Sequence, residues 1–129
     1  LPGLEAKLDA NRGKVIILDF WEHDEDNCQR AAPFMNRMYT KYKRQGLLII
    51  GLSIDEDHDD ARFLMTAAGT KYPTFMADDR VQDAYGLRFV PYYVYIDREG
   101  KVRGEDVGFY EDKKNEIENK IVELLKESG

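Results

Sequence analysis

Cysteine is scarce in this sequence of 129 residues, which contains only Cys28. A single cysteine excludes a disulfide within the chain and any zinc site that needs several cysteine ligands. Serine is also rare, with only Ser53 and Ser128. Ser53 falls in a predicted strand, so a Ser–His–Asp triad has little support. Glycine-rich phosphate-binding loops are absent as well, and the sequence therefore offers no motif for nucleotide chemistry.

Long apolar runs and an excess of positive charge are missing too. The longest apolar runs, at residues 15–18 and 47–52, have the length of strands and fall short of the roughly 18–20 residues that a membrane span needs. The formal net charge is −6, and lysines and arginines are spread over several segments, which argues against nucleic acid as a partner. The length fits one domain, so we expect a single domain over residues 1–129.

Hydrophobic patterns predict alternating helices and strands. Nearly continuous apolar runs are typical of buried strands, and apolar residues three and four apart are typical of amphipathic helices. The expected strands are residues 15–20, 47–54, 72–76, 92–96 and 101–107, and the expected helices are residues 3–10, 28–45, 61–68, 81–85 and 111–126. Asp26 or Asn27 should cap the long helix, and Gly46 should end it. Pro33 should kink this helix or lie in its first turns. The order predicts an α/β fold with three layers, α/β/α, around a mixed central sheet.

Several local sequences, taken in this order, resemble the thioredoxin superfamily. The segment 13–21 looks like the strand that leads into a thioredoxin active site, Cys28 follows it, and Pro33 lies beyond that cysteine. Phe89-Val90-Pro91 looks like the segment that carries the cis-proline, and segment 93–102 resembles the hairpin of TlpA/ResA-like proteins. Over residues 4–126 the chain is similar to that branch. The resemblance implies a thioredoxin-like fold, thiol-disulfide oxidoreductase ancestry and an extracytoplasmic or periplasmic location.

The reacting residues of that branch are not all kept. The resemblance implies two cysteines, separated by two residues, at the start of the first long helix. This chain reads Glu25-Asp26-Asn27-Cys28 there, so Cys28 takes the position of the second cysteine and Glu25 that of the missing first one. Disulfide exchange needs an attacking thiolate and a second thiol that resolves the mixed disulfide. We therefore expect no ordinary dithiol exchange.

The peptide groove of the family does not depend on a cysteine. In thioredoxin-like proteins the main chain of the residue before the cis-proline pairs with the substrate, a form of strand addition. The resemblance implies that Val90 and Pro91 keep this role, and Trp21 can offer a flat apolar wall. We interpret the chain as a binding or accessory domain that holds a protein or peptide partner beside Pro91 and needs no cofactor.

Cys28 leaves a second interpretation open, in which one thiol forms a mixed disulfide with a partner or with glutathione. A peroxidase with one cysteine is a related alternative, although Glu25 stands where peroxiredoxins have Thr or Ser and would repel a thiolate. The carboxylates of Asp24, Glu25 and Asp26 are expected to raise the pKa of Cys28, which predicts a poor nucleophile. A simple packing role for a small, half-buried side chain competes with both alternatives.

Two acidic loops offer a third interpretation, metal binding. The expected loops at residues 22–27 and 55–60 each contain one histidine and follow neighbouring parallel strands, so they should meet at the carboxyl edge of the sheet. Carboxylate and imidazole groups can hold a cation, although acidic loops are usually just solvated. The candidate ligands are His23, Asp24, Asp26, Asp57 and His58.

Overall fold

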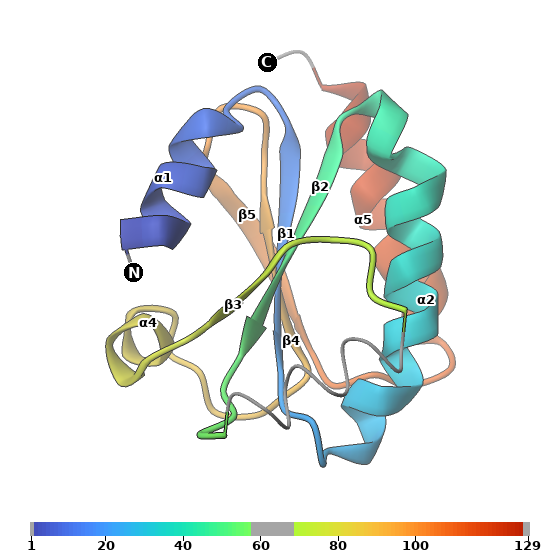
Figure 1. Cartoon of the computed structure of the whole chain (residues 1–129). Coiled ribbons are helices and arrows are strands. Elements are labelled where there is room, and N and C mark those ends of the chain that lie inside the picture. Colours follow the sequence, from blue (N-terminus) through green and yellow to red (C-terminus); the bar gives the residue numbers. More distant parts are fainter. Residues whose placement is uncertain (1, 58–68, 128–129) are drawn as a thin grey trace.

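Five strands form one mixed sheet at the centre of the protein, in the order β3-β2-β1-β4-β5 (Figure 1). The structure is a computed structural model that describes residues 2–57 and 69–127. In chain order the elements are α1 (Pro2–Ala10), β1 (Val15–Trp21), α2 (Asp26–Tyr42), the 3-10 helix η1 (Lys43–Gln45), β2 (Leu47–Ser53), β3 (Thr74–Met76), α4 (Asp79–Ala84), β4 (Tyr92–Ile96), β5 (Val102–Val107) and α5 (Lys113–Lys126). The helix predicted at residues 61–68 lies outside the described residues. The other predicted elements are present, with slightly shifted ends.

The strands β1 and β2 form the buried centre of the sheet. Every residue of both strands is buried, as expected for strands that are covered on both faces. They pair in parallel, with Val15 opposite Leu47 and Trp21 opposite Ser53. β4 is antiparallel to β1, and β5 is antiparallel to β4, so the sheet is mixed as predicted.

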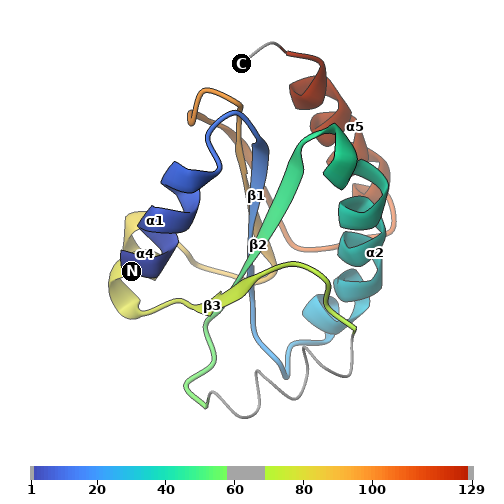
Figure 2. The ribbon, with the colours of Figure 1, turned by 45° about the horizontal axis from the view of Figure 1, so that its top comes forward.

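Helices cover both faces of the sheet, α2 and α5 on one side and α1 and α4 on the other (Figures 1 and 2). Successive residues of a strand point to opposite faces, so Ile17 packs with Met35 and Ile121 in one core while Leu18 packs with Val81 in the other. Each such side chain contributes roughly 1.5–3 kcal/mol by leaving water. None of the helices in the described ranges is long and apolar enough to span a membrane.

The long helix α2 begins earlier than predicted because its N-cap is Glu25. The expectation that Asp26 or Asn27 would cap it was wrong. Gly46 ends the following 3-10 helix with a φ of +110°, a conformation that glycine adopts without steric cost. Pro33 lies inside α2, where it removes one main-chain hydrogen bond without dividing the helix.

Candidate functional site

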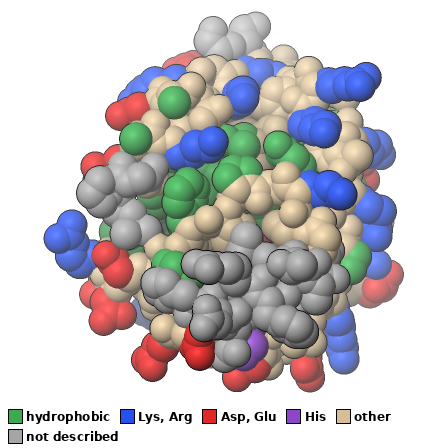
Figure 3. All heavy atoms as spheres, in the orientation of Figure 1, with side chains coloured by type: hydrophobic (Ala, Val, Ile, Leu, Met, Phe, Trp, Pro, Cys, Tyr) green, Lys and Arg blue, Asp and Glu red, His purple; other side chains and the backbone are tan. Residues whose placement is uncertain are grey.

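The carboxyl ends of β1 and β2 bring the described parts of the two acidic loops together, as predicted. The main-chain N–H of His23 donates to Asp55 Oδ1 at 3.0 Å, and His23 Nδ1 contacts the same oxygen at 2.5 Å. Ser53 Oγ donates to Asp55 Oδ2 at 2.6 Å. These bonds join the segments that follow β1 and β2 at one edge of the molecule. Acidic side chains gather along this lower margin, whereas lysines and arginines lie mostly over other parts of the visible face (Figure 3).

The candidate metal ligands do not form a centre among the residues that can be placed. Within residues 2–57 and 69–127, no group of three or more His, Cys, Asp or Glu side chains is arranged to hold a metal ion. His23 instead contacts the buried Asp55, and His58 lies outside the described residues. Asp24, Asp26 and Asp57 belong to no such group among the described residues, and the metal interpretation stays a prediction.

Glu25 stands where the resemblance places the missing cysteine, and its side chain caps α2. Its backbone is extended, with φ −89° and ψ 119°, and its Oε2 accepts the main-chain N–H of Cys28 at 3.0 Å. The first turn of a helix has unpaired N–H groups and the positive end of the helix dipole, so an anion is favoured there. The position thus stabilises a carboxylate by the same means that lower the pKa of a cysteine thiol at a helix N-terminus.

Cys28 is shielded from solvent, with 6% of its surface exposed. Burial is the largest cause that raises the pKa of its thiol far above the ordinary value, and nearby carboxylates, including those of Asp19 and Glu25, raise it further. The predicted rise is therefore present, but its main cause is burial. Asp24 and Asp26, which we expected to contribute, are not among its largest causes.

Asp19, within β1, is a candidate that the sequence analysis did not single out. Its side chain is 5% exposed, and its Oδ2 accepts a hydrogen bond from the Tyr72 hydroxyl at 3.2 Å. Burial raises the pKa of Asp19 to about 7, against the opposing effect of the Tyr72 hydrogen bond. An ionisable residue inside an otherwise apolar strand is rare unless it is paired, and this was the signal in the sequence that could have found it.

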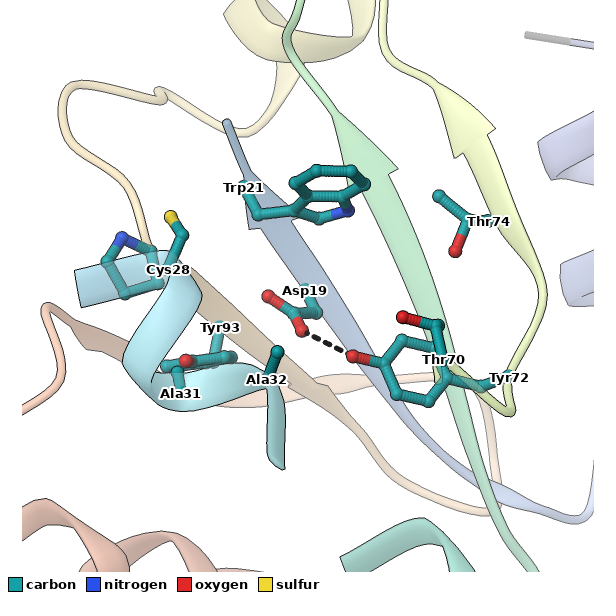
Figure 4. Close-up of a pocket in the computed structure, with 10 residues that line it drawn as sticks. Asp19, Trp21, Cys28, Ala31, Ala32, Thr70, Tyr72, Thr74 and Tyr93 are labelled. Atoms are coloured by element: carbon teal, nitrogen blue, oxygen red, sulfur yellow. Dashed lines mark hydrogen bonds between the residues drawn. The ribbon is translucent and has the colours of Figure 1, made fainter. Parts of the chain in front are cut away.

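A small cavity separates β1 from the start of α2 (Figure 4). Its volume is about 30 Å³, enough for a molecule the size of water. It is lined by Asp19, Trp21, Cys28, Ala31, Ala32, Thr70, Tyr72, Thr74, Pro91 and Tyr93. The Tyr93 hydroxyl and Thr74 Oγ1 are buried and have no hydrogen-bond partner among the described atoms. Gly51 makes this arrangement possible, because a Cβ atom there would lie 2.7 Å from Thr74 Oγ1 and 3.3 Å from Trp21 Nε1.

The residues predicted to form the peptide groove gather around the thiol. Trp21 and Cys28 pack together, with Val90 against them, and Pro91 lines the cavity beside Cys28. The Val90–Pro91 peptide bond is cis. Phe89, just before Val90, is 70% exposed. The geometry brings the predicted binding residues to one place, and their binding role stays a prediction.

Comparisons with known proteins agree on the family. Residues 3–105 match the AhpC/TSA family. The thiol-disulfide oxidoreductase ResA of Bacillus thuringiensis (strain Al Hakam) is 30% identical over 125 residues, which cover 96% of this chain and 71% of that protein. A Chlorobium tepidum protein assigned as the thiol:disulfide interchange protein DsbE has a TM-score of 0.88 at 29% identity, over 92% of this chain and 84% of its own. A second Chlorobium tepidum thiol:disulfide interchange protein, of strain TLS, has a TM-score of 0.82 at 23% identity, over 94% and 84%.

Sheet order, motif order and overall similarity therefore lead to the same assignment. The chain has a single cysteine and therefore lacks the cysteine pair of these relatives, while the scaffold is kept. The chain belongs to the AhpC/TSA family and, within the thioredoxin superfamily, to the branch of the ResA-like thiol-disulfide oxidoreductases.

Proposed function

We propose that this chain is a thioredoxin-like binding or accessory domain, which holds a protein or peptide partner in the groove beside Pro91 and does not exchange disulfides. The observation that carries the proposal is the role of Glu25. The resemblance gives Glu25 the position of the attacking sulfur, and the Glu25 carboxylate accepts the main-chain N–H of Cys28. A carboxylate cannot form the mixed disulfide through which exchange proceeds.

The environment of Cys28 favours binding over chemistry with one thiol. Reactive cysteines are partly exposed and have a lowered pKa, because the thiolate is the nucleophile. Cys28 is buried, and its pKa is raised. We therefore rank a mixed disulfide or a peroxidase activity at Cys28 behind the binding role.

The groove retains features that a partner needs. Recognition by strand addition uses main-chain N–H and C=O groups and requires no thiol. Val90 lies beside the apolar pair of Trp21 and Cys28, so a partner chain that passes the cis-proline segment would meet both main-chain groups and an apolar wall.

Restoring the missing sulfur tests this proposal. Glu25→Cys should form an intramolecular disulfide with Cys28 on oxidation, because it restores at the start of α2 the two cysteines, separated by two residues, that the resembling family uses for exchange. We expect no catalysed reduction of insulin by dithiothreitol with the unmodified chain, and turnover above background with the variant. Glu25→Ser is the matched control, because serine also caps helices but has no thiol.

Each result has a direct meaning for the proposal. Turnover of insulin by the unmodified chain would overturn it. If Glu25→Cys forms no disulfide, residue 25 is not the counterpart of the missing cysteine. Iodoacetamide labelling of Cys28 across pH tests the alternative. A free cysteine has a pKa of about 8.5, and we expect Cys28 to be labelled more slowly than a free cysteine at every pH. Fast labelling below neutral pH would favour chemistry at Cys28.

A further inference from the structure

A groove is lined in part by the residues that lead into the cis-proline. It lies between Glu25 at the start of α2, Ile54 just after β2, and the segment 87–90. Its volume is about 350 Å³, within the range of sites that bind small molecules or side chains. Its apolar lining comes from Ile54, Leu87, Phe89 and Val90. Because Phe89 is 70% exposed, part of this apolar surface is open to a partner.

The main chain along this groove is unpaired. In the part of the chain that the structure describes, the N–H and C=O groups of Arg88, Phe89 and Val90 form no hydrogen bond. Pairing resumes at Pro91, whose carbonyl accepts the N–H of Gly108 at 2.8 Å. An extended segment laid along residues 88–90 could therefore form main-chain hydrogen bonds there, whatever its own sequence.

The surroundings of the groove are strongly acidic. Residues 22–26 and 55–57 contain seven carboxylates and no lysine or arginine. Among the described residues, no Lys or Arg forms an ion pair with Glu22, Asp24, Glu25, Asp26 or Glu56. Burial is the largest cause that raises the pKa of Glu22, and the neighbouring carboxylates of Asp24 and Asp55 raise it further, the direction expected when like charges lie close together. A cation brought to this edge would relieve the repulsion between them.

On the basis of the function proposed above, we infer that the groove binds an extended peptide segment in which lysine or arginine alternates with apolar residues. Alternate side chains of an extended chain point to opposite sides. One set can contact Phe89 and Val90 while the other reaches Glu25 and the carboxylates beside it. Among the described atoms the carboxylate of Glu25 forms a hydrogen bond only through Oε2, which leaves Oε1 to accept from the cation. An acidic segment would meet like charge, which opposes binding.

A labelled peptide of defined charge tests this inference. The probe is a short, blocked peptide that alternates lysine with valine, and two further peptides carry glutamine or glutamate in place of lysine. By fluorescence anisotropy at low salt, the lysine peptide should bind at least about tenfold more tightly than the glutamine peptide. The ratio should shrink as ionic strength rises from about 0.01 M to 0.15 M, because the Debye length falls from about 30 Å to 8 Å.

Removal of the carboxylates beside the groove should abolish the preference for the lysine peptide without changing the groove itself. A chain with Asp24→Asn, Glu25→Gln and Asp26→Asn should bind the lysine and glutamine peptides equally. A matched control removes the same number of carboxylates at exposed positions outside the groove and should keep the preference: Asp9→Asn, Glu99→Gln and Glu123→Gln. Arg88→Gln removes the one cation of the groove lining and should tighten binding of the lysine peptide.

The outcomes distinguish this inference from the function on which it rests. Equal binding of the lysine and glutamine peptides that is lost in Phe89→Ser would overturn the cationic preference and leave binding in the groove in place. Binding of the lysine peptide that survives both Phe89→Ser and the triple variant would be diffuse attraction to an acidic chain, and would also overturn it. If none of the three peptides binds, the inference is overturned. The insulin assay would still test, independently, whether the chain has lost disulfide exchange.

Discussion

Asp19 on β1 and Asp106 on β5 both lie opposite Tyr93 of β4 in the register of the sheet, and each is 5% exposed. Each accepts a hydrogen bond from a tyrosine hydroxyl, Asp19 from Tyr72 at 3.2 Å and Asp106 from Tyr95 at 2.8 Å. Despite this likeness their acidities differ. Burial raises the pKa of Asp19 to about 7, whereas the pKa of Asp106 lies below its ordinary value.

The difference comes from two lysines of α5 and from the deeper enclosure of Asp19. Burial is also the largest single influence on Asp106 and acts to raise its pKa, but hydrogen bonds from Lys120, Tyr95 and Lys113 together outweigh it. Lys120 Nζ lies 2.8 Å from Asp106 Oδ2, and Lys113 Nζ lies 3.1 Å from Oδ1. In the described ranges no lysine or arginine pairs with Asp19. Two carboxylates of the same solvent exposure thus differ in acidity: Asp106 is held as an anion beside α5, whereas Asp19, enclosed more deeply beside Cys28, gains or loses its proton near neutral pH.

The largest effect should follow from Asp19→Asn. The folded chain holds the proton of Asp19 up to about pH 7, whereas the unfolded chain releases it near 3.8, so the wild-type chain loses stability as the pH rises between these values. The variant has no such loss, and we expect its free energy of unfolding at pH 8 to exceed that of the wild type by about 2–4 kcal/mol. The gain should vanish near pH 4. Urea unfolding at both pH values measures it, and a less stable variant at pH 8 would contradict the assignment of Asp19 as a buried acid.

A smaller effect of opposite sign is expected for Asp106→Asn. The pKa of Asp106 is lowered in the folded chain, so its ionisation stabilises the fold at pH values above the ordinary pKa of an aspartate. This stabilisation is lost as the pH falls through the pKa of the folded chain. The variant should be less stable at pH 7 by about 1–3 kcal/mol, because Lys113 and Lys120 lose their acceptor. Glu116→Gln is the control: Glu116 contacts Lys113 at 3.3 Å from an exposed side chain, and we expect less than about 0.5 kcal/mol. If Asp106→Asn and Glu116→Gln lose the same amount of stability, the burial of Asp106 does not strengthen its pairing with the lysines.

The smallest effects should follow from removal of the tyrosine hydroxyls. Tyr72→Phe and Tyr95→Phe should each cost roughly 0.5–1.5 kcal/mol of stability. Both hydroxyls lower the pKa of the aspartate that they contact, so each variant should raise it. Carbon NMR titration of Asp19 and Asp106 in the two variants measures the shifts. A fall in the pKa of Asp19 in Tyr72→Phe would show that the hydroxyl does not donate to this carboxylate.

The strands and long helices could be predicted because their signals are local. Strand formation around Ile17 and Ile49 follows from apolar runs of a few residues. The end of the segment after α2 follows from a single glycine. The start of α2 could not be predicted, because a cap is decided by which side chain reaches a particular N–H group. Glutamate is not among the preferred N-cap residues, so the sequence favours Asp26 and Asn27 over Glu25.

The order of the motifs along the sequence predicted only part of the site. Trp21, Cys28 and Val90 come together as the order of motifs indicates. The pair of Asp19 and Tyr72 joins residues 53 positions apart, and they meet because β2 and β3 continue the sheet beyond β1. A contact of that kind depends on topology, which no local pattern contains.

The cap at Glu25 has a practical consequence for protein engineering. Because the Glu25 carboxylate completes the first turn of α2 by accepting the N–H of Cys28, a shorter oxygen acceptor such as that of serine, threonine or aspartate should also begin the helix there. The side chain at this one position can therefore be exchanged to vary the chemistry at the mouth of the groove while the start of α2 is kept.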